Sequence, residues 1–214
     1  MSKDQKIYKT FCPMPKMNSG MLTLEDLEQI TEIVRRYEVP MIKVTGAQRL
    51  SYHGITPEKM AALKKELHIP ETLPHKRNKV HYVQACPGKT WCKWGTKTTE
   101  EMTKAIENLE LDGPLPNKVK VGISGCQLCC CESWMRDIGL LAEKRGWRLT
   151  FGGNAGNRAR IGDLVARGLS DDEALELIKK VLNYYISKAQ FTTRSARFME
   201  RFGIETLKKD LGIA

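Results

Sequence analysis

Six of the seven cysteines lie in two short segments, and this distribution constrains the fold more than any other feature of the sequence. The first segment has a Cys-x5-Cys pair and the second a Cys-x3-Cys pair with two further cysteines: Cys86 and Cys92, then Cys126, Cys129, Cys130 and Cys131. Each segment follows a β-prone run, so two parallel strands ending side by side would bring the thiols together. Four converging thiolates can bind a [4Fe–4S] cluster, because soft sulfur ligands delocalise charge over the metals.

A four-cysteine zinc site is the main alternative for these thiols. Cys126 and Cys129 have the Cys-x2-Cys spacing of a zinc knuckle. The interval between Cys86 and Cys92 is too long for the partner knuckle, which favours the iron–sulfur interpretation. Free buried thiols are a third explanation, and the density of cysteines argues against it.

The chain has 214 residues and a formal net charge of +10, with its basic residues scattered along the sequence. It contains no long lysine or arginine run and no nucleic-acid-binding motif, so we expect no nucleic-acid partner. A polyanionic cofactor or an acidic protein partner would account for the charge. No segment approaches the roughly 18 to 20 apolar residues that cross a membrane, and no secretory signal is visible. We therefore expect a cytoplasmic protein without membrane insertion.

Hydrophobic spacing and capping residues predict a first unit over residues 1–75. A capping box at Thr23 opens an amphipathic helix, and two short strands are predicted over 41–45 and 50–55. A second helix restarts at Pro57, with proline at its first position. The predicted order is helix, strand, strand, helix.

A second unit is predicted over residues 76–214, and it contains both cysteine segments. One strand, over 80–83, leads into the first segment, and another, over 118–123, leads into the second. Further elements are predicted in chain order: a helix over 98–109 with a capping box at Thr98, a β-prone pair at 138–141 and 147–151, a helix capped by Ser170 to about Lys188, and short helices in the last 20 residues.

Several motifs together resemble the nitrite and sulfite reductases that couple sirohaem to a [4Fe–4S] cluster. The motifs are the two cysteine pairs, the second within Ile-Ser-Gly-Cys-x-x-x-Cys, a Thr-x-x-Gln segment over 41–55, a Leu-Pro-x-Lys-x-Lys strand over 115–121, Asp-Ile-Gly-Leu over 137–140, and Gly-Gly-Asn-Ala-Gly over 152–156 with Arg160. The resemblance covers roughly residues 20 to 205. It implies an α+β fold, in which a ferredoxin-like unit packs on an α/β unit that binds both cofactors.

The resemblance also assigns cofactor ligands. It implies that the cluster is bound by Cys86, Cys92, Cys126 and Cys130, and that Cys130 bridges to the sirohaem iron. Contacts to sirohaem are expected from Thr45, Gln48, Arg77, Lys79, Asn154 and Arg160. Cys129 and Cys131 are not family ligands, and we expect them to be small residues facing the core or the macrocycle edge.

Lys118 and Lys120 lie two residues apart on a predicted strand and therefore share a face. A solvated sheet face is one interpretation, but the resemblance implies that both bind the substrate anion and supply protons. The family has an arginine directly before the glutamine of its Thr-x-x-Gln segment, where this chain has Ala47. Arg49 would lie on the same face of an extended strand and is the candidate replacement.

The expected function is the six-electron reduction of sulfite to sulfide. Full-length family members contain two copies of this unit, whereas this chain has one and most resembles the single-repeat, low-molecular-weight, assimilatory-type sulfite reductases. Reduction of nitrite to ammonia and a non-catalytic sirohaem/iron–sulfur electron carrier are the alternatives. Expected partners are a small anion and an acidic electron-donor protein such as a ferredoxin. Arg194, Arg197 and Arg201 predict a basic stripe on a C-terminal helix, either solvated or docking that donor or sirohaem.

Overall fold

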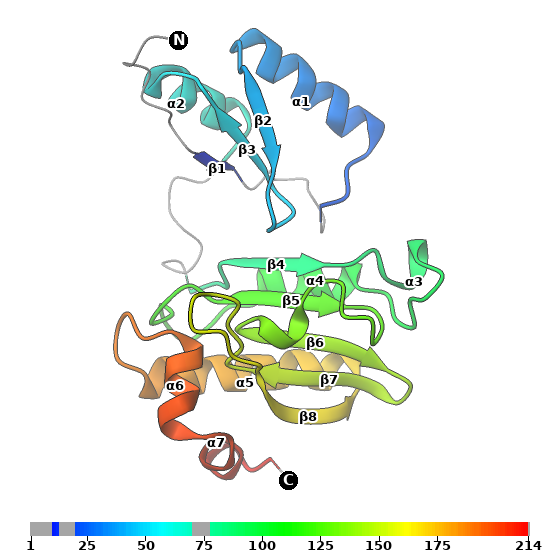
Figure 1. Ribbon diagram of the computed structural model, residues 1–214, viewed down its shortest axis with the longest axis vertical. Helices are drawn as coiled ribbons and strands as arrows, with labels where there is room; N and C mark the ends of the chain where they lie inside the picture. The colour runs from blue at the N-terminus through cyan, green and yellow to red at the C-terminus, as the bar shows by residue number, and fades with distance from the viewer. Residues whose placement is uncertain (1–9, 13–19, 70–77, 214) are drawn as a thin grey trace. The chain divides into compact units, whose positions relative to one another are not determined.

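The structure is a computed structural model that describes residues 10–12, 20–69 and 78–213. It divides into two compact units, Met1–Glu71 and Thr72–Ala214 (Figure 1). The sequence predicts this division a few residues later, at residue 75. Within the described parts of the chain, no helix is long and apolar enough to cross a membrane.

The first unit is a three-stranded antiparallel sheet with two helices. Its elements are β1 (Thr10–Cys12), α1 (Leu24–Arg36), β2 (Met41–Val44), β3 (Leu50–His53) and α2 (Pro57–Glu66), and its strand order is β1-β3-β2. The predicted capping box opens α1, because the Asp26 amide donates to Thr23 Oγ1 (3.1 Å) and the Thr23 amide to Asp26 Oδ2 (3.2 Å). The predicted helix–strand–strand–helix order is confirmed, with β1 as an additional strand.

The second unit is built on a five-stranded mixed sheet in the order β4-β5-β6-β7-β8. Its strands are β4 (Tyr82–Ala85), β5 (Lys120–Ser124), β6 (Ile138–Glu143), β7 (Gly146–Phe151) and β8 (Asp163–Leu169). Its helices are α3 (Gly88–Trp91), α4 (Glu100–Asn108), the 3-10 turn η2 (Ser133–Met135), α5 (Asp171–Lys188), α6 (Ser195–Phe202) and α7 (Ile204–Leu211). β4, β5 and β6 are parallel, and β7 and β8 continue the sheet antiparallel.

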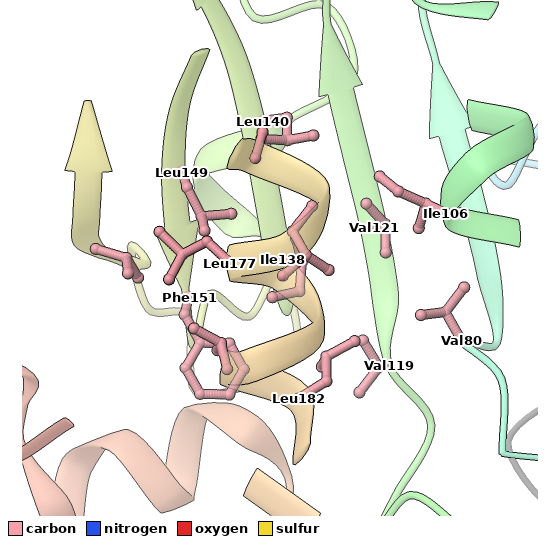
Figure 2. Close-up of a cluster of buried hydrophobic side chains, with 14 of the residues drawn as sticks. Val80, Ile106, Val119, Val121, Ile138, Leu140, Leu149, Phe151, Leu177 and Leu182 are labelled. Carbon is pink, nitrogen blue, oxygen red and sulfur yellow. The ribbon is translucent and has the colours of Figure 1, made fainter. Parts of the chain in front are cut away.

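The two faces of this sheet have different chemistry. Helices α4 and α5 lie on one face (Figure 1). Figure 2 shows Val121 of β5 and Ile138 of β6 in the apolar cluster formed with Leu177 and Leu182 of α5. Because side chains alternate along a strand, the even-numbered positions of β5 face the other way, toward η2 and the second cysteine segment. The apolar face forms the hydrophobic core, and the polar face contacts the second cysteine segment.

The predicted boundaries near the cysteines need two corrections. β5 begins at Lys120, so Lys118 precedes the strand rather than lying on it. The α4 helix begins at Glu100 with Thr99 as N-cap, so the predicted capping box at Thr98 is wrong. The Thr99 hydroxyl donates instead to the carbonyl oxygen of Cys86 (2.6 Å), because this tertiary contact competes successfully with local capping. β8 and α3 were not predicted.

Candidate cofactor and substrate site

The two cysteine segments leave neighbouring parallel strands at the same edge of the sheet. Ala85 at the end of β4 pairs with Ile123 of β5, and the Cys86 amide donates to the Ile123 carbonyl (3.1 Å). Cys126 follows β5 by two residues. The ladder between β4 and β5 therefore places both segments side by side, as their sequence positions predicted.

Backbone contacts lock the two cysteine segments together. The carbonyl of Gly125, directly before Cys126, accepts from the Thr96 amide (2.7 Å) and the Thr96 hydroxyl (3.0 Å) of the first segment. A Cβ atom at Gly125 would lie 2.9 Å from both Gly88 Cα and Lys97 O. Only glycine permits this approach, so the Ile-Ser-Gly-Cys motif has a packing reason beside any role in ligation.

Cys86 lies in surroundings that favour its thiolate. A hydrogen bond from the Cys131 thiol lowers the pKa of Cys86 to about 5, against the effect of burial. The Gly125 amide also donates to Cys86 Sγ (3.1 Å) and contributes to the lower pKa. The same contact with Cys86, together with burial, raises the pKa of Cys131. Thiolates rather than thiols bind metal, so Cys86 is prepared as a ligand and Cys131 as its hydrogen-bond donor.

The second segment makes a tight turn in which its cysteines differ in exposure. Cys129 and Glu132 have left-handed backbones, with φ angles of 58° and 54°. Cys130 is exposed, Cys126 and Cys129 are half-buried, and Cys131 is buried at 1% exposure. The buried position of Cys131 agrees with the small core residue that we expected.

All six cysteines from Cys86 to Cys131 are unbridged. In the described residues, no three histidine, cysteine or acidic side chains gather as candidate ligands of a single metal ion. The chemistry that the two segments offer is a set of thiols on interlocked loops, one of them held as a thiolate. These residues fit an iron–sulfur cluster, whose irons are each bound by a separate thiolate.

Arg136 is a site residue that the sequence analysis missed. Its guanidinium is buried and donates to the Tyr82 hydroxyl (3.2 Å) and to Gln84 Oε1 (2.6 Å), both on β4. It also donates to the Cys131 carbonyl (3.3 Å) and forms an ion pair with Glu132 (2.9 Å). Arg136 thus fastens the second cysteine segment to the strand that leads to the first. The signal in the sequence that could have indicated such a residue is the pair Tyr82 and Gln84 on β4, because polar side chains on a buried strand require hydrogen-bond partners.

The packing beneath this segment also depends on a glycine. A Cβ atom at Gly122 of β5 would lie 2.7 Å from Arg136 Cγ and 2.9 Å from the Cys131 carbonyl. Ser124 of the same strand lies 2.9 Å (Oγ to Oγ) from Ser133 and accepts from the Cys131 amide (3.3 Å). The polar face of β5 is therefore covered closely by the segment that carries the cysteines.

Lys118 and Lys120 lie at the opposite end of β5 from Cys126. The five-residue strand spans about 13 Å and separates the two lysines from Cys126, and their role toward the substrate stays a prediction. Lys120 is half-buried, with Nζ 5.8 Å from the centroid of the Tyr82 ring, whereas Lys118 is exposed. Burial, followed by the positive charges of Arg194 and Lys118, lowers the pKa of Lys120. A proton on Lys120 is therefore more readily given up than on an ordinary lysine.

The Thr-x-x-Gln segment is a turn in the first unit. The Thr45 amide donates to the Arg49 carbonyl (2.8 Å), the Gln48 amide donates to the Thr45 carbonyl (3.0 Å), and Gln48 has a φ of 56°. The expectation that Arg49 shares a face with Ala47 on an extended strand is wrong, because the chain reverses between them. The roles of Thr45, Gln48 and Arg49 toward cofactor or substrate stay predictions.

The Gly-Gly-Asn-Ala-Gly segment is a closed loop in the second unit. Asn154 and Arg160 form an isolated backbone bridge, and Asn154 Nδ2 donates to the Arg158 carbonyl (2.8 Å). The Arg160 guanidinium donates to the Gly152 carbonyl (3.0 Å) and to Asp163 (2.6 Å). These bonds shape the loop, and a sirohaem contact from Asn154 or Arg160 stays a prediction. So does a contact from the half-buried Lys79, and Arg77 lies outside the described residues.

The predicted arginine stripe on the C-terminal helix is wrong in one essential member. Arg194 is the N-cap residue of α6 rather than part of the helix, and its guanidinium binds the buried Asp137 (2.9 Å). Arg197 pairs with Glu200 on the same helix. Arg201 is exposed. The three arginines therefore do not form one free basic surface.

The comparisons with known proteins agree with this architecture. Residues 76–213 match the nitrite and sulphite reductase 4Fe-4S domain, and residues 9–68 match the nitrite/sulfite reductase ferredoxin-like half domain. An assimilatory-type sulfite reductase of Nitratidesulfovibrio vulgaris is 40% identical over 94% of this chain and 91% of its own length. The chain belongs to the nitrite and sulfite reductase family. This membership implies a [4Fe–4S] cluster and sirohaem as its cofactors.

Other relatives are longer proteins that contain a similar portion. A nitrite reductase [NAD(P)H] of Bacillus subtilis is 31% identical over 94% of this chain, which covers 25% of that protein. Among solved structures, a dissimilatory sulfite reductase matches with a TM-score of 0.79 at 12% identity. The match covers 97% of this chain and 69% of the reductase chain. The NirA protein of Mycobacterium tuberculosis matches with a TM-score of 0.71 at 20% identity, and the match covers 94% of this chain and 39% of the NirA chain. The two structures support the fold.

Proposed function

We propose that this protein reduces sulfite to sulfide in six one-electron steps, and that the oxygen atoms leave as water. The observation that carries the proposal is the 40% identity, over nearly the full length of both chains, with an assimilatory-type sulfite reductase. The paired ends of β4 and β5, which carry both cysteine segments, support it. When bound, the [4Fe–4S] cluster and sirohaem would supply the one-electron redox chemistry that this reduction requires.

In this proposal Cys86, Cys92, Cys126 and Cys130 bind the cluster, and Cys130 also bridges to sirohaem. The exposure of Cys130 supports that role, because a bridging sulfur must be open to the second cofactor. Hydrogen bonds that stabilise the Cys86 thiolate support its role as a ligand. Cys129 and Cys131 support the turn and the Cys86 sulfur rather than binding iron.

Lys118 and Lys120 would bind the anion and deliver protons to its oxygens. A positive charge holds an oxyanion, and a lysine with a lowered pKa gives up its proton more readily near neutral pH. The half-buried position of Lys120 favours it as the principal proton donor, with the exposed Lys118 assisting. Thr45, Gln48 and Arg49, in the turn of the first unit, are also proposed to contact cofactor or substrate.

Nitrite is the second candidate substrate, because nitrite reductases of 31% identity match 94% of the chain. Turnover by anaerobically purified protein with reduced viologen distinguishes the two, with sulfide and ammonia measured as products. We expect sulfide formation to have the higher kcat/KM. A protein that binds both cofactors and oxidises viologen with neither anion would be an electron carrier, and a protein without acid-labile sulfide would contradict the proposal.

We also propose that an acidic protein supplies the electrons. The first cysteine segment presents Trp91 and Trp94 at 74% and 60% exposure, beside the exposed Lys89 and Lys93. The Lys93 ammonium lies 5.1 Å from the centroid of the Trp94 ring. An apolar surface edged by cations, directly next to a cluster ligand, suits a negatively charged partner that must bring its own redox centre close.

A further inference from the structure

A buried carboxylate, Asp137, joins the start of β5 to the segment that precedes α6. Asp137 is 1% exposed. Its oxygens accept hydrogen bonds from the Lys120 amide (2.9 Å), from Arg194 Nη2 (2.9 Å to each oxygen) and from the Ser195 hydroxyl. A carboxylate this deeply buried needs such partners to offset its desolvation. Asp137 therefore fixes the Lys120 backbone relative to the Arg194 guanidinium.

A second set of bonds ties the same two segments together. The Thr192 amide donates to the Pro116 carbonyl (2.9 Å), and Asn117 Nδ2 donates to the Thr192 carbonyl (2.5 Å). The Lys118 amide in turn donates to Asn117 Oδ1 (2.8 Å). The segment before α6 thus braces the chain that carries both lysines of the proposed substrate site.

The ammonium of Lys120 lies among charges contributed by each neighbouring element. The groups that face it are Tyr82 of β4, Lys118 before β5, Arg136 and Asp137 before β6, and Arg194 before α6. After burial, Arg194 has the largest effect in lowering the pKa of Lys120, and Asp137 acts in the opposite direction. The Arg194 Nε is buried and has no hydrogen-bond partner among the described residues.

We infer that Arg194 is a positioning residue for the reduction of the bound anion, because it braces the start of β5 through Asp137 and stands as a fixed cation beside Lys120. The inference rests on the proposed function of Lys120. A mobile surface arginine could not do this, since solvent would screen its charge and the carboxylate would not hold it. Nη2 of Arg194 donates to both oxygens of the buried Asp137, and these charge-assisted bonds hold the guanidinium in place.

The direct test measures Lys120 itself. In purified holoprotein, the rate of Lys120 acetylation by acetic anhydride is followed against pH by peptide mass spectrometry. In Arg194→Gln we expect the titration midpoint to move to higher pH, because a neighbouring positive charge is lost and Asp137 is left unbalanced. Arg148→Gln is the matched control, since Arg148 also forms a partly buried ion pair, with Glu143, and also has a buried Nε without a partner among the described residues. Its midpoint should equal that of the wild type.

Turnover provides the second measurement. We expect kcat/KM for sulfite, per bound sirohaem, to fall about tenfold in Arg194→Gln, and its high-pH limb to move upward with the Lys120 midpoint. Arg194→Lys keeps the charge but not the planar guanidinium, so its values should be intermediate. Both a wild-type midpoint and a wild-type kcat/KM in Arg194→Gln would overturn the inference. If Arg194→Gln does not fold, wild-type values in Arg194→Lys would overturn it. A wild-type protein inactive with sulfite would refute the proposed function, while the acetylation midpoint would still decide the effect of Arg194.

Discussion

At the scale of single residues, adjacent cysteines in one turn have different roles because they have different surroundings. Cys130 is exposed, Cys131 is buried at 1% exposure, and Cys129, directly before them, has a left-handed backbone. The thiol of Cys131 donates a hydrogen bond to the sulfur of Cys86, which is distant in sequence. Chemical identity alone therefore does not make a cysteine a ligand, and exposure and hydrogen bonding distinguish the candidates.

Replacement of Cys130 by serine should abolish the cluster or uncouple it from sirohaem, because a serine oxygen is a hard ligand that bridges poorly. Cys129→Ser, one position away in the same turn, should retain both cofactors and is the matched control. Absorption spectra with iron and acid-labile sulfide analyses measure the outcome. Loss of the cluster in Cys129→Ser together with its retention in Cys130→Ser would show that the ligand assignment is shifted.

The two lysines should also differ from each other. We expect Lys120→Met to lower kcat for sulfite about 100-fold with cofactor content unchanged, because it removes a half-buried proton donor. Lys118→Met should have a smaller effect, since an exposed ammonium is screened by water. Steady-state turnover with viologen, normalised to bound sirohaem, provides the comparison. Full activity in both variants would indicate that the lysines are solvated surface residues without a role in turnover.

At the scale of secondary-structure elements, the polar face of the sheet is arranged around one arginine. The Arg136 guanidinium binds two side chains of β4 and the backbone of the second cysteine segment. The opposite face of the same strands is apolar and covered by α4 and α5 (Figure 2). The alternation of side chains along β4 and β5 thus separates the stabilising core from the face that is covered by the second cysteine segment.

Arg136→Met should lower the free energy of unfolding by about 2–3 kcal/mol, because the Tyr82 hydroxyl and the Gln84 amide lose a buried partner. The same variant should hold less cluster per chain, since the second cysteine segment loses its attachment to β4. Urea unfolding and iron content measure the two effects. Arg201→Met, at an exposed position of α6, should change stability by less than about 0.5 kcal/mol. Equal stability and iron content in the two variants would argue against the role of Arg136.

At the scale of the whole molecule, one copy of the family unit presents its first cysteine segment openly. Trp91 and Trp94 are 74% and 60% exposed, and they lie close to Cys92 in the sequence. Exposed apolar surface beside a redox centre shortens the path for electrons from a docked partner. The surrounding lysines then favour an acidic partner over other proteins.

The double replacement Lys89→Glu and Lys93→Glu should slow reduction by an acidic protein donor, with the largest effect at low ionic strength, where screening is weak. Reduction by viologen should remain unchanged, because a small donor needs no docking surface. Lys179→Glu with Lys180→Glu on α5 makes the same change in net charge at exposed positions and is the control. Stopped-flow reduction rates against salt concentration measure the effect. Equal slowing by both double variants would indicate net charge rather than a docking site.

Much of the fold follows from local sequence signals. The caps at Thr23 and Ser170 and the proline at the start of α2 correctly predict helices. These features act within a turn or two of the chain and need no distant partner. The β-prone runs before each cysteine segment likewise predict β4 and β5, and the cysteine spacing with its accompanying motifs indicates the family.

The tertiary structure decided what depends on residues distant in sequence. The hydroxyl of Thr99, the N-cap residue of α4, donates to the Cys86 carbonyl, and the predicted capping box at Thr98 does not form. Arg194 binds Asp137 instead of joining a basic stripe. Arg136 gained its role from two side chains of β4 more than 50 positions away. In each case a hydroxyl or guanidinium met a buried partner that the folded sheet supplies, and an unpaired buried polar group is costly enough to override the local preference. The sequence by itself therefore determined most of the elements and the position of both cysteine segments, whereas only the folded sheet determined which polar side chains hold those segments and the two lysines in place.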